Sequence, residues 1–516
     1  MSIDTPTNFA ALDAAIVVVY LVATTLAGVL ANRRVGGIAA YVVGGRAAGT
    51  SLNAASYVGT GLGLVTLMYA SIDAFSYGFS YVTLALVSFL VSLFLGVTGF
   101  VIGPLRRLEL LTISEFFERR FDRRTRIIGG FIGALAGILN MGLFPKMGAT
   151  FVTFLTGASL TAPSAETIVN LVMSLLIVVV VAYTVLGGMI SVLVTDYLQF
   201  VVLTLGLLVG VVACLWHPQL GWERIVHAMA AERGARMFNP VAEDGYGWIW
   251  VVFNTVVFAA AAVCWAPEAS RSLTARSERV ARLTFLLAAP GQFMRLAVPS
   301  LFAVAMFCLV AQAPDLQAHF FPNGLAGDAA NAEQAMPFFL SRVVPSGALG
   351  LVAAGALAAF MSTHDSYLLC WASVLTRDVY VPLARKKVDQ ATQIRLTRLG
   401  VVAIGVFLLV WGVWYELPES VWTYMAVTGT IYMSGATVVL IGGLYWSRAS
   451  SAGALAALLG GLVAVVGLFR DALGRWTGVD VPGEVIGLAS YVFCAILFVV
   501  FSLAMPDRER ATGRER

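Results

Sequence analysis

The chain has 516 residues, of which 59% are hydrophobic and only 12% are charged, and its formal net charge is +4. This composition excludes an ordinary soluble protein, because apolar runs of about twenty residues recur and such runs are long enough to cross a bilayer as helices. We expect an all-α polytopic membrane protein, and the small positive charge requires no nucleic-acid partner.

Hydropathy predicts thirteen transmembrane helices, which would form one domain over residues 1–505. The expected ranges are 12–32, 51–72, 78–103, 127–157, 167–187, 190–214, 247–266, 284–312, 346–376, 397–415, 420–446, 452–470 and 485–505. The first is not expected to be a cleaved signal peptide, because residues 1–11 contain no Lys or Arg whereas Arg33 and Arg34 follow the span.

Lys and Arg residues fall mostly in one alternate set of loops. The positive-inside rule therefore predicts a multi-pass protein of the cell inner (cytoplasmic) membrane, with its N-terminus outside. The C-terminus, with a short tail at 506–516, is expected in the cytoplasm.

The second span, TSLNAASYVGTGLGLVTLMYASID, carries glycines at Gly59, Gly61 and Gly63. Glycine is a poor helix former, so we expect the helix to break here. A broken helix at membrane depth is tolerated where it lines a cavity, in which freed carbonyls can bind a cation. The alternative interpretation is a small-residue face for close helix packing.

Three further features follow in the first half of the chain. The basic stretch 111–127 has an amphipathic spacing that predicts a short helix on the cytoplasmic face. Lys146 lies toward the outer end of its span, and we expect its side chain to reach the interface. Asp196 follows a Gly-Gly turn without a local basic partner. It fits a cation ligand, a proton carrier or the partner of an arginine on another helix.

The sequence contains no known catalytic motif and no known metal-binding motif. The five cysteines show no metal-ligand spacing, and no nucleotide-binding or nucleophile motif is present. We therefore expect neither an enzyme nor a structural metal site.

The stretch from Ala353 to Tyr380, AAGALAAFMSTHDSYLLCWASVLTRDVY, carries polar groups inside an apolar helix. A charged residue at a helix centre costs about 2.5 to 3.5 kcal/mol by insertion scales, so Asp365 suggests a function. On a helix, one face would share Ala359, Ser362, Thr363, Asp365 and Ser366. This face offers hard oxygen ligands to a small cation. Alternatively, the hydroxyls bond to carbonyls four residues earlier and Asp365 pairs with a buried base.

Five motifs together resemble the sodium:solute symporter family, over roughly residues 10 to 505. They are TISEFFERRF, YTVLGGMISVLVTDYLQ, SRSLTARS, MSTHDSYLLCWASVLTRDVY and GLYWSRASSAGA. The resemblance implies a fold of the leucine-transporter type, with inverted five-helix repeats at about 51–214 and 247–446. One extra N-terminal helix and two C-terminal helices flank this core. Pro267 and Glu268 interrupt the first helix of the second repeat, as the glycines interrupt that of the first.

The resemblance also implies the binding sites. A sodium ion would be held by the carbonyls of Ala54, Tyr57 and Ala359 and the hydroxyls of Ser362 and Thr363. A second cation, which some relatives hold, would use Asp196, Asp365 and Ser366. Asp365 departs from the hydroxyl expected there, and two carboxylates could instead share a proton or a sodium ion. The substrate cavity would lie near Ser56, Thr60, Trp265, Glu268, Arg295 and Met425. For Arg295, substrate contact and a salt bridge to Asp365 or Glu268 both stay open.

The expected function is sodium-coupled secondary active symport of a small organic solute by alternating access. Sodium would be co-transported, without an organic cofactor, and the partners would be the solute and the bilayer, with no obligatory protein partner. His364 beside Asp365 makes proton coupling the alternative, although the sodium ligand set contains no titratable group. A transporter-like sensory module is a further alternative, weakened because no binding domain follows Ala504. The identity of the substrate stays open.

Overall fold

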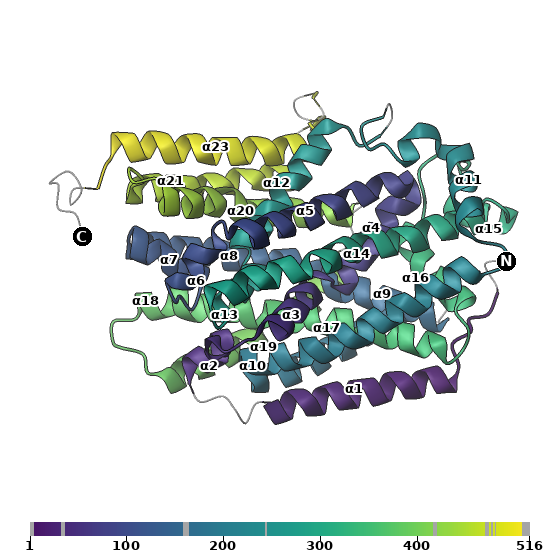
Figure 1. The fold of residues 1–516 in the computed structure, drawn as a ribbon, viewed down its shortest axis with the longest axis horizontal. Coiled ribbons are helices and arrows are strands. Elements are labelled where there is room, and N and C mark those ends of the chain that lie inside the picture. Colours follow the sequence, from purple (N-terminus) through teal and green to yellow (C-terminus); the bar gives the residue numbers. More distant parts are fainter. Residues whose placement is uncertain are drawn as a thin grey trace.

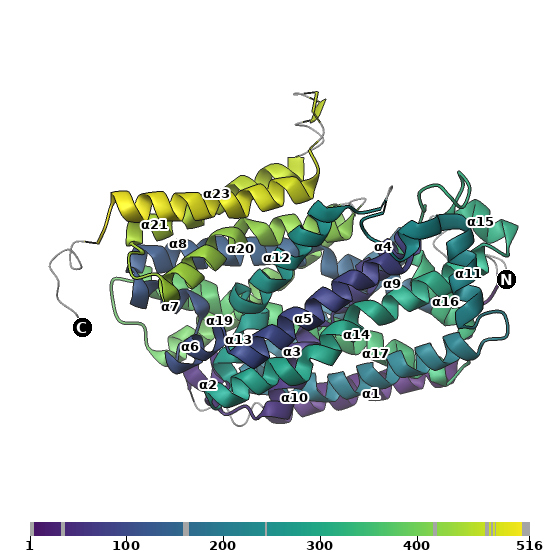
Figure 2. The same ribbon diagram turned by 45° about the horizontal axis from the view of Figure 1, so that its top comes forward.

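The structure, a computed structural model, describes residues 5–31, 37–157, 165–242, 245–415, 420–469, 474–475, 478–479 and 481–507. The secondary structure of these residues is helical apart from one isolated bridge between Ala48 and Ala275. The long helices run roughly side by side, as Figures 1 and 2 show from two directions. α1 (Ala11–Ala31) begins at one end of the bundle and α23 (Gly483–Ala504) ends at the other (Figure 1). The expected tail lies outside the described residues from residue 508 onward.

Apolar helices make up the body of the bundle. Besides α1 and α23, they are α3 (Thr50–Gly61), α4 (Leu64–Tyr77), α5 (Val82–Thr98), α8 (Arg123–Asn140), α9 (Phe144–Thr156), α10 (Ala165–Trp216), α12 (Trp248–Cys264), α14 (Glu278–Val310), α17 (Ala348–Val374), α19 (Gln390–Trp414), α20 (Val421–Tyr445) and α21 (Ser451–Gly460). Shorter helices join them, namely α2 (Ile38–Val43), α6 (Ile102–Arg107), α7 (Ile113–Arg120), α11 (Trp222–Arg233), α13 (Ala266–Thr274), α15 (Pro314–Phe320), α16 (Ala332–Val343) and α18 (Val381–Leu383).

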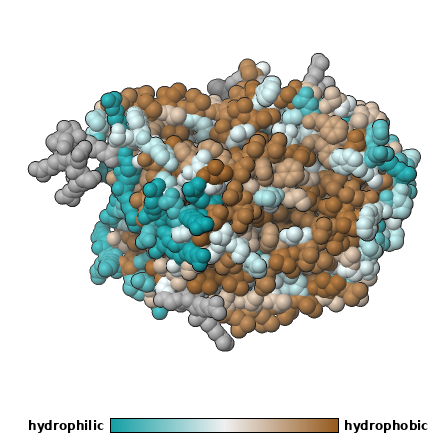
Figure 3. Space-filling view, viewed as in Figure 1, coloured by the Kyte–Doolittle hydropathy of each residue, from teal (hydrophilic) through white to brown (hydrophobic). Residues whose placement is uncertain are grey.

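The helices have the length and composition of membrane spans. In the described part of the chain, ten segments qualify, and the bent pair α12 and α13 would add an eleventh. Two of the ten, Leu64–Thr98 and Glu166–Trp216, each contain an internal break at a glycine with positive φ, Gly78 and Gly188. All the predicted spans thus coincide with observed helices, and thirteen crossings stay a prediction. Figure 3 shows a broad apolar band with hydrophilic residues gathered at its two ends, as a bilayer requires.

The second span is broken where the glycines predicted it. α3 ends at Gly61 and α4 begins at Leu64, with Leu62 at φ −95° and ψ 58° between them. The same glycines also pack closely, because a Cβ on Gly63 would lie only 2.4 Å from Thr363 Oγ1. Both interpretations of these glycines therefore hold.

A matching break lies between α12 and α13, whose axes differ by 45°. Trp265 joins them in an extended conformation, and Pro267 lies in the first turn of α13. Proline is tolerated there because its missing N–H would have no helical partner. The predicted pairing of two interrupted helices is confirmed.

The short basic helix is also confirmed, as α7. Thr112 caps it by accepting a hydrogen bond from the backbone N–H of Glu115, and Arg120 donates to the Gly443 carbonyl at the end of α20. Lys146 donates to the Tyr415 carbonyl just beyond α19, at a distance of 3.1 Å.

α17 lies in the centre of the molecule, and nearly all its residues are buried. α10 runs along it, and a Cβ on Gly206 of α10 would come within 2.8 Å of the Leu351 carbonyl oxygen. Small residues of this kind let two membrane helices approach closely. The polar residues of α17 therefore face protein, not lipid.

Candidate functional site

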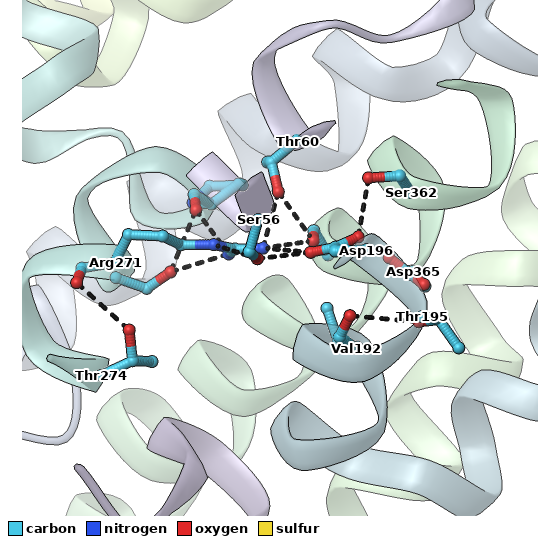
Figure 4. Close-up of polar contacts among 12 residues, drawn as sticks. Ser56, Thr60, Val192, Thr195, Asp196, Arg271, Thr274, Ser362 and Asp365 are labelled. Carbon is cyan, nitrogen blue, oxygen red and sulfur yellow. Dashed lines mark hydrogen bonds and ion pairs between the residues drawn. The ribbon is translucent and has the colours of Figure 1, made fainter. Parts of the chain in front are cut away.

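The polar face of α17 meets the broken α3 in the middle of the bundle (Figure 4). Thr363 Oγ1 donates to the Thr60 carbonyl at 3.2 Å, and Ser362 Oγ donates to Asp196 Oδ1 at 2.7 Å. The Thr60 carbonyl lies in the last turn of α3, where carbonyls have no partner within the helix. The two hydroxyls thus bond across helices instead of to carbonyls four residues earlier.

The expected sodium ligands lie on these two helices. Ala359 is buried on α17 one turn before Ser362, while Ala54 and Tyr57 are buried in α3 before its break. The Tyr57 ring packs against Phe285, with ring centroids 4.5 Å apart. The structure brings α3 and α17 together as expected, and coordination of an ion by the five residues stays a prediction.

Asp196 forms a buried ion pair with Arg271 of α13. Arg271 Nη2 lies 3.1 Å from Asp196 Oδ2, and both side chains are fully buried. The same guanidinium donates to the hydroxyls of Ser56, Thr60 and Ser366. Of the three roles open to Asp196, the structure shows the partner of an arginine on another helix.

Arg271 was not among the predicted site residues. The seventh predicted span ends at residue 266, so the sequence placed Arg271 in a basic cytoplasmic loop. The structure corrects this placement, because Arg271 lies on helix α13, which begins after the break, and its side chain is buried in the protein core. One signal was present in the sequence: Arg271 follows Glu268 by three residues, so a helix resuming after Pro267 would place both on one side.

Asp365 is not paired with Arg295. Its Oδ2 lies 3.0 Å from the Tyr183 hydroxyl, and its Oδ1 has no hydrogen-bond partner among the described residues. Ser366 already accepts a hydrogen bond from Arg271 at 2.7 Å. A second cation would therefore have to share Asp196 and Ser366 with the Arg271 guanidinium, and its site stays a prediction.

A cavity lies beside these polar residues. The space in it that the centre of a water molecule can occupy is about 80 Å³. Its lining includes the expected residues Thr60, Trp265, Glu268, Arg295 and Met425. Aromatic rings form much of the wall, from Tyr69, Phe144, Phe258, Tyr367 and Trp422. Ser56 was expected here as well, but it faces α10 and α13, where its hydroxyl donates to Asp196 Oδ2.

Arg295 forms its ion pair with Glu268, so the structure selects one of the salt bridges that the sequence left open. Arg295 Nη1 lies 3.6 Å from Glu268 Oε1 and donates to the Gly61 carbonyl at 3.3 Å. The guanidinium carbon lies 5.2 Å from the centre of the Phe258 ring. Both charged side chains line the cavity, so substrate contact remains compatible with the salt bridge.

Comparison with known proteins identifies a family and several relatives of this chain. A family model described as "Sodium:solute symporter family" matches residues 41–461. A sodium/sialic acid symporter from Proteus mirabilis is 23% identical over 471 residues, which is 89% of this chain and 90% of that protein. A sodium/pantothenate symporter from Haemophilus influenzae is 24% identical, over 81% of this chain and 82% of its own length.

Solved structures show the same fold. A sodium-coupled sialic acid symporter in a substrate-bound outward-open state aligns with a TM-score of 0.78 at 19% identity, covering 96% of this chain and 99% of that one. The structure of MhsT in complex with L-phenylalanine aligns with a TM-score of 0.52 at 12% identity, over 89% of this chain and 99% of its own.

Proposed function

The chain belongs to the sodium:solute symporter family, and on this premise we propose that the cavity beside the two helix breaks is where its solute binds. The protein is a sodium-coupled symporter of a small organic solute, not an enzyme. It is a multi-pass membrane protein. Its N-terminus is proposed to lie outside, because basic residues concentrate in the loops that this orientation places in the cytoplasm.

The proposed sodium ligands are the carbonyls of Ala54, Tyr57 and Ala359 and the hydroxyls of Ser362 and Thr363. The observation that carries this proposal is the contact of Ser362 and Thr363 with the glycine-broken α3. Neutral oxygens suit a hard monovalent cation better than a transition metal. Ala54 and Tyr57 precede the last four residues of α3, so their carbonyls would bind the ion in addition to their hydrogen bonds within the helix.

The proposed transport cycle moves one repeat against the other. The repeats are 51–214 and 247–446 within a single domain of 1–505, and each begins with an interrupted helix that borders the cavity. Residues of both repeats line the cavity, so a relative movement would change which side it opens to.

Purified protein reconstituted into liposomes tests the coupling ion. An inward sodium gradient at equal pH is expected to drive solute accumulation, and an inward proton gradient without sodium is not. Proton coupling is the rival, because Asp365 has a carboxylate oxygen without a hydrogen-bond partner among the described residues. Accumulation driven by the proton gradient alone would replace sodium coupling with that rival.

A second cation at Asp196, Asp365 and Ser366 is proposed separately. Two buried carboxylates repel each other, and one arginine balances only one of them. A sodium ion bound beside Asp365 would balance the other. Asp365→Asn is then expected to lower the Hill coefficient of sodium dependence toward one, whereas Arg295→Gln would change solute affinity more than sodium affinity. An unchanged Hill coefficient in Asp365→Asn would remove the second ion.

A further inference from the structure

The cavity is lined by one negative and one positive side chain. Of the described residues that form its wall, only Glu268 and Arg295 carry a formal charge. Their side chains are 13% and 5% exposed, so both are largely removed from bulk water. A buried charge has to be matched, and a solute with an excess charge would leave one of the two residues unmatched.

Each of the two charges also lies at a helix end of the opposite sign. Arg295 donates to the carbonyl of Gly61, the last residue of α3, where the helix dipole is negative. Glu268 lies in the first turn of α13, where the dipole is positive. These helix ends stabilise both charged forms, so the pair does not depend on a tight mutual contact. Arg295 Nη1 and Glu268 Oε1 are 3.6 Å apart, and Arg295 Nε has no hydrogen-bond partner among the described residues. Each of the two groups is therefore able to bind a ligand.

The contact with Gly61 also places this pair at the break. A Cβ on Gly61 would lie 2.6 Å from Arg295 Nη1 and 3.7 Å from Glu268 Oε1. A ligand held by the two charges would therefore lie directly beside the end of α3, on the helix that is proposed to carry two of the sodium ligands. Binding of the solute and of sodium would order the same broken helix.

Much of the rest of the wall is apolar, and polar side chains of Thr60, Thr66, Asn140 and Thr363 also line it. Beyond the charged pair, the cavity is bordered by Tyr69, Phe144, Val257, Phe258, Trp422 and Met433. A hydrocarbon group of the solute can be buried there, at about 25 cal/mol for each Å² of apolar surface removed from water.

We propose that the solute is an α-amino acid with an apolar side chain, bound as the zwitterion with its carboxylate on Arg295 and its ammonium on Glu268. This assignment rests on the proposed function of the cavity as the solute site. The carboxylate and ammonium of an α-amino acid are attached to one carbon, so their spacing matches two protein charges that are 3.6 Å apart. A carboxylate can accept two parallel hydrogen bonds from a guanidinium, which favours it as the partner of Arg295.

Ligand binding to the purified protein in sodium buffer tests the assignment, read by intrinsic fluorescence because Trp265 and Trp422 line the cavity. The probes are alanine, valine, leucine and phenylalanine, each against the hydroxy acid and the amide of the same skeleton. For leucine, ε-aminocaproate is an isomer whose two charges are far apart. At least one of the amino acids is expected to bind about tenfold or more tightly than each of its analogues. Each analogue loses one charged hydrogen bond, and a loss of this size accounts for the difference.

Charge-neutralising variants supply the sharper test. In Glu268→Gln the preference is expected to shift toward the hydroxy acid, and in Arg295→Gln toward the amide. Glu278→Gln is the matched control, because its carboxylate pairs with Arg107 at 3.3 Å at the start of α14, away from the cavity wall. The control is expected to leave the preference unchanged. A cooperative thermal unfolding transition would show that each variant is folded, even where the unpaired charge lowers its unfolding temperature.

Three results of the binding experiments would overturn the amino-acid assignment. They are equal binding of an amino acid and its neutral or separated-charge analogue, an unchanged preference in both cavity variants, and binding of none of the four amino acids. Sodium-driven uptake of a sugar or a simple carboxylate would also overturn it, while leaving symport intact. Conversely, an amino acid that binds as predicted but is taken up without any sodium dependence would contradict the proposed function and not the cavity chemistry.

Discussion

Ser362 and Thr363 lie against α3 close to its break, because a Cβ on Gly59 would lie 2.9 Å from Ser362 Oγ and Thr363 Oγ1 donates to the Thr60 carbonyl. We predict that Ser362→Ala and Thr363→Ala each weaken sodium dependence strongly, since each removes one oxygen ligand that no other side chain replaces. The measurement is sodium-dependent thermal stabilisation of the purified protein, in which an ion that binds only the folded state raises the unfolding temperature.

Ser373→Ala is a suitable control for these variants. It also removes a buried hydroxyl from α17, about three turns beyond Ser362. The control is expected to respond to sodium as the wild type does. Wild-type sodium affinity in the double variant of Ser362 and Thr363 would refute the assigned ligands.

The Asp196 and Arg271 pair gives a second prediction at the same scale. Removing one member leaves a buried charge without its partner, which typically costs about 3 to 5 kcal/mol. We therefore expect Asp196→Asn and Arg271→Gln each to lower thermal stability sharply, and the double variant to lose less than the sum of the two. A denaturation cycle of the four proteins measures this coupling. Additive losses would show that the two side chains do not stabilise each other.

At the scale of the helix, the break between α3 and α4 combines freed carbonyls with close packing. Gly63 is the position where a side chain is least tolerable, because a new Cβ would lie 2.4 Å from Thr363 Oγ1 and 3.1 Å from Thr363 Cβ. No rotamer of Thr363 removes the contact with its own Cβ. The helices would have to separate exactly where the sodium ion is proposed to bind, so the break and the ion site depend on one another.

We predict that Gly63→Ala abolishes sodium-driven uptake and destabilises the protein by about 1 to 3 kcal/mol, the usual cost of overpacking. Gly49→Ala is the matched control, because Gly49 precedes α3 and a Cβ there meets no atom within 4 Å. Uptake and stability like those of the wild type in Gly63→Ala would show that α3 and α17 need not stay in contact.

For the whole molecule, the described chain begins and ends at opposite ends of the helix bundle (Figure 1). We predict that Glu223→Cys is labelled from outside intact cells by a membrane-impermeant maleimide, and that Lys386→Cys is labelled only after the membrane is opened. All five native cysteines are buried, so the wild type serves as the unlabelled background. The reverse pattern of labelling would invert the proposed orientation.

The sequence by itself determined the features that depend on neighbouring residues. Apolar runs located the helices, because the length and hydropathy of one segment suffice to place it in a membrane. Glycines 59, 61 and 63 and Pro267 located both helix breaks, because backbone freedom and the missing proline N–H act locally. The face of α17 with Ser362 and Thr363 followed from helical periodicity alone.

Only the tertiary structure decided which polar groups meet. Asp196 and Arg271 are separated by 75 residues, and nothing near either one specifies the other. Arg295 pairs with Glu268 and not with Asp365, and Ser56 turns toward Asp196 instead of the cavity. These choices depend on how five helices rotate and approach one another, and that arrangement is set by packing along their whole length. The charged cavity wall and the buried arginine beside the proposed ion site are therefore properties of the fold and not of any single segment.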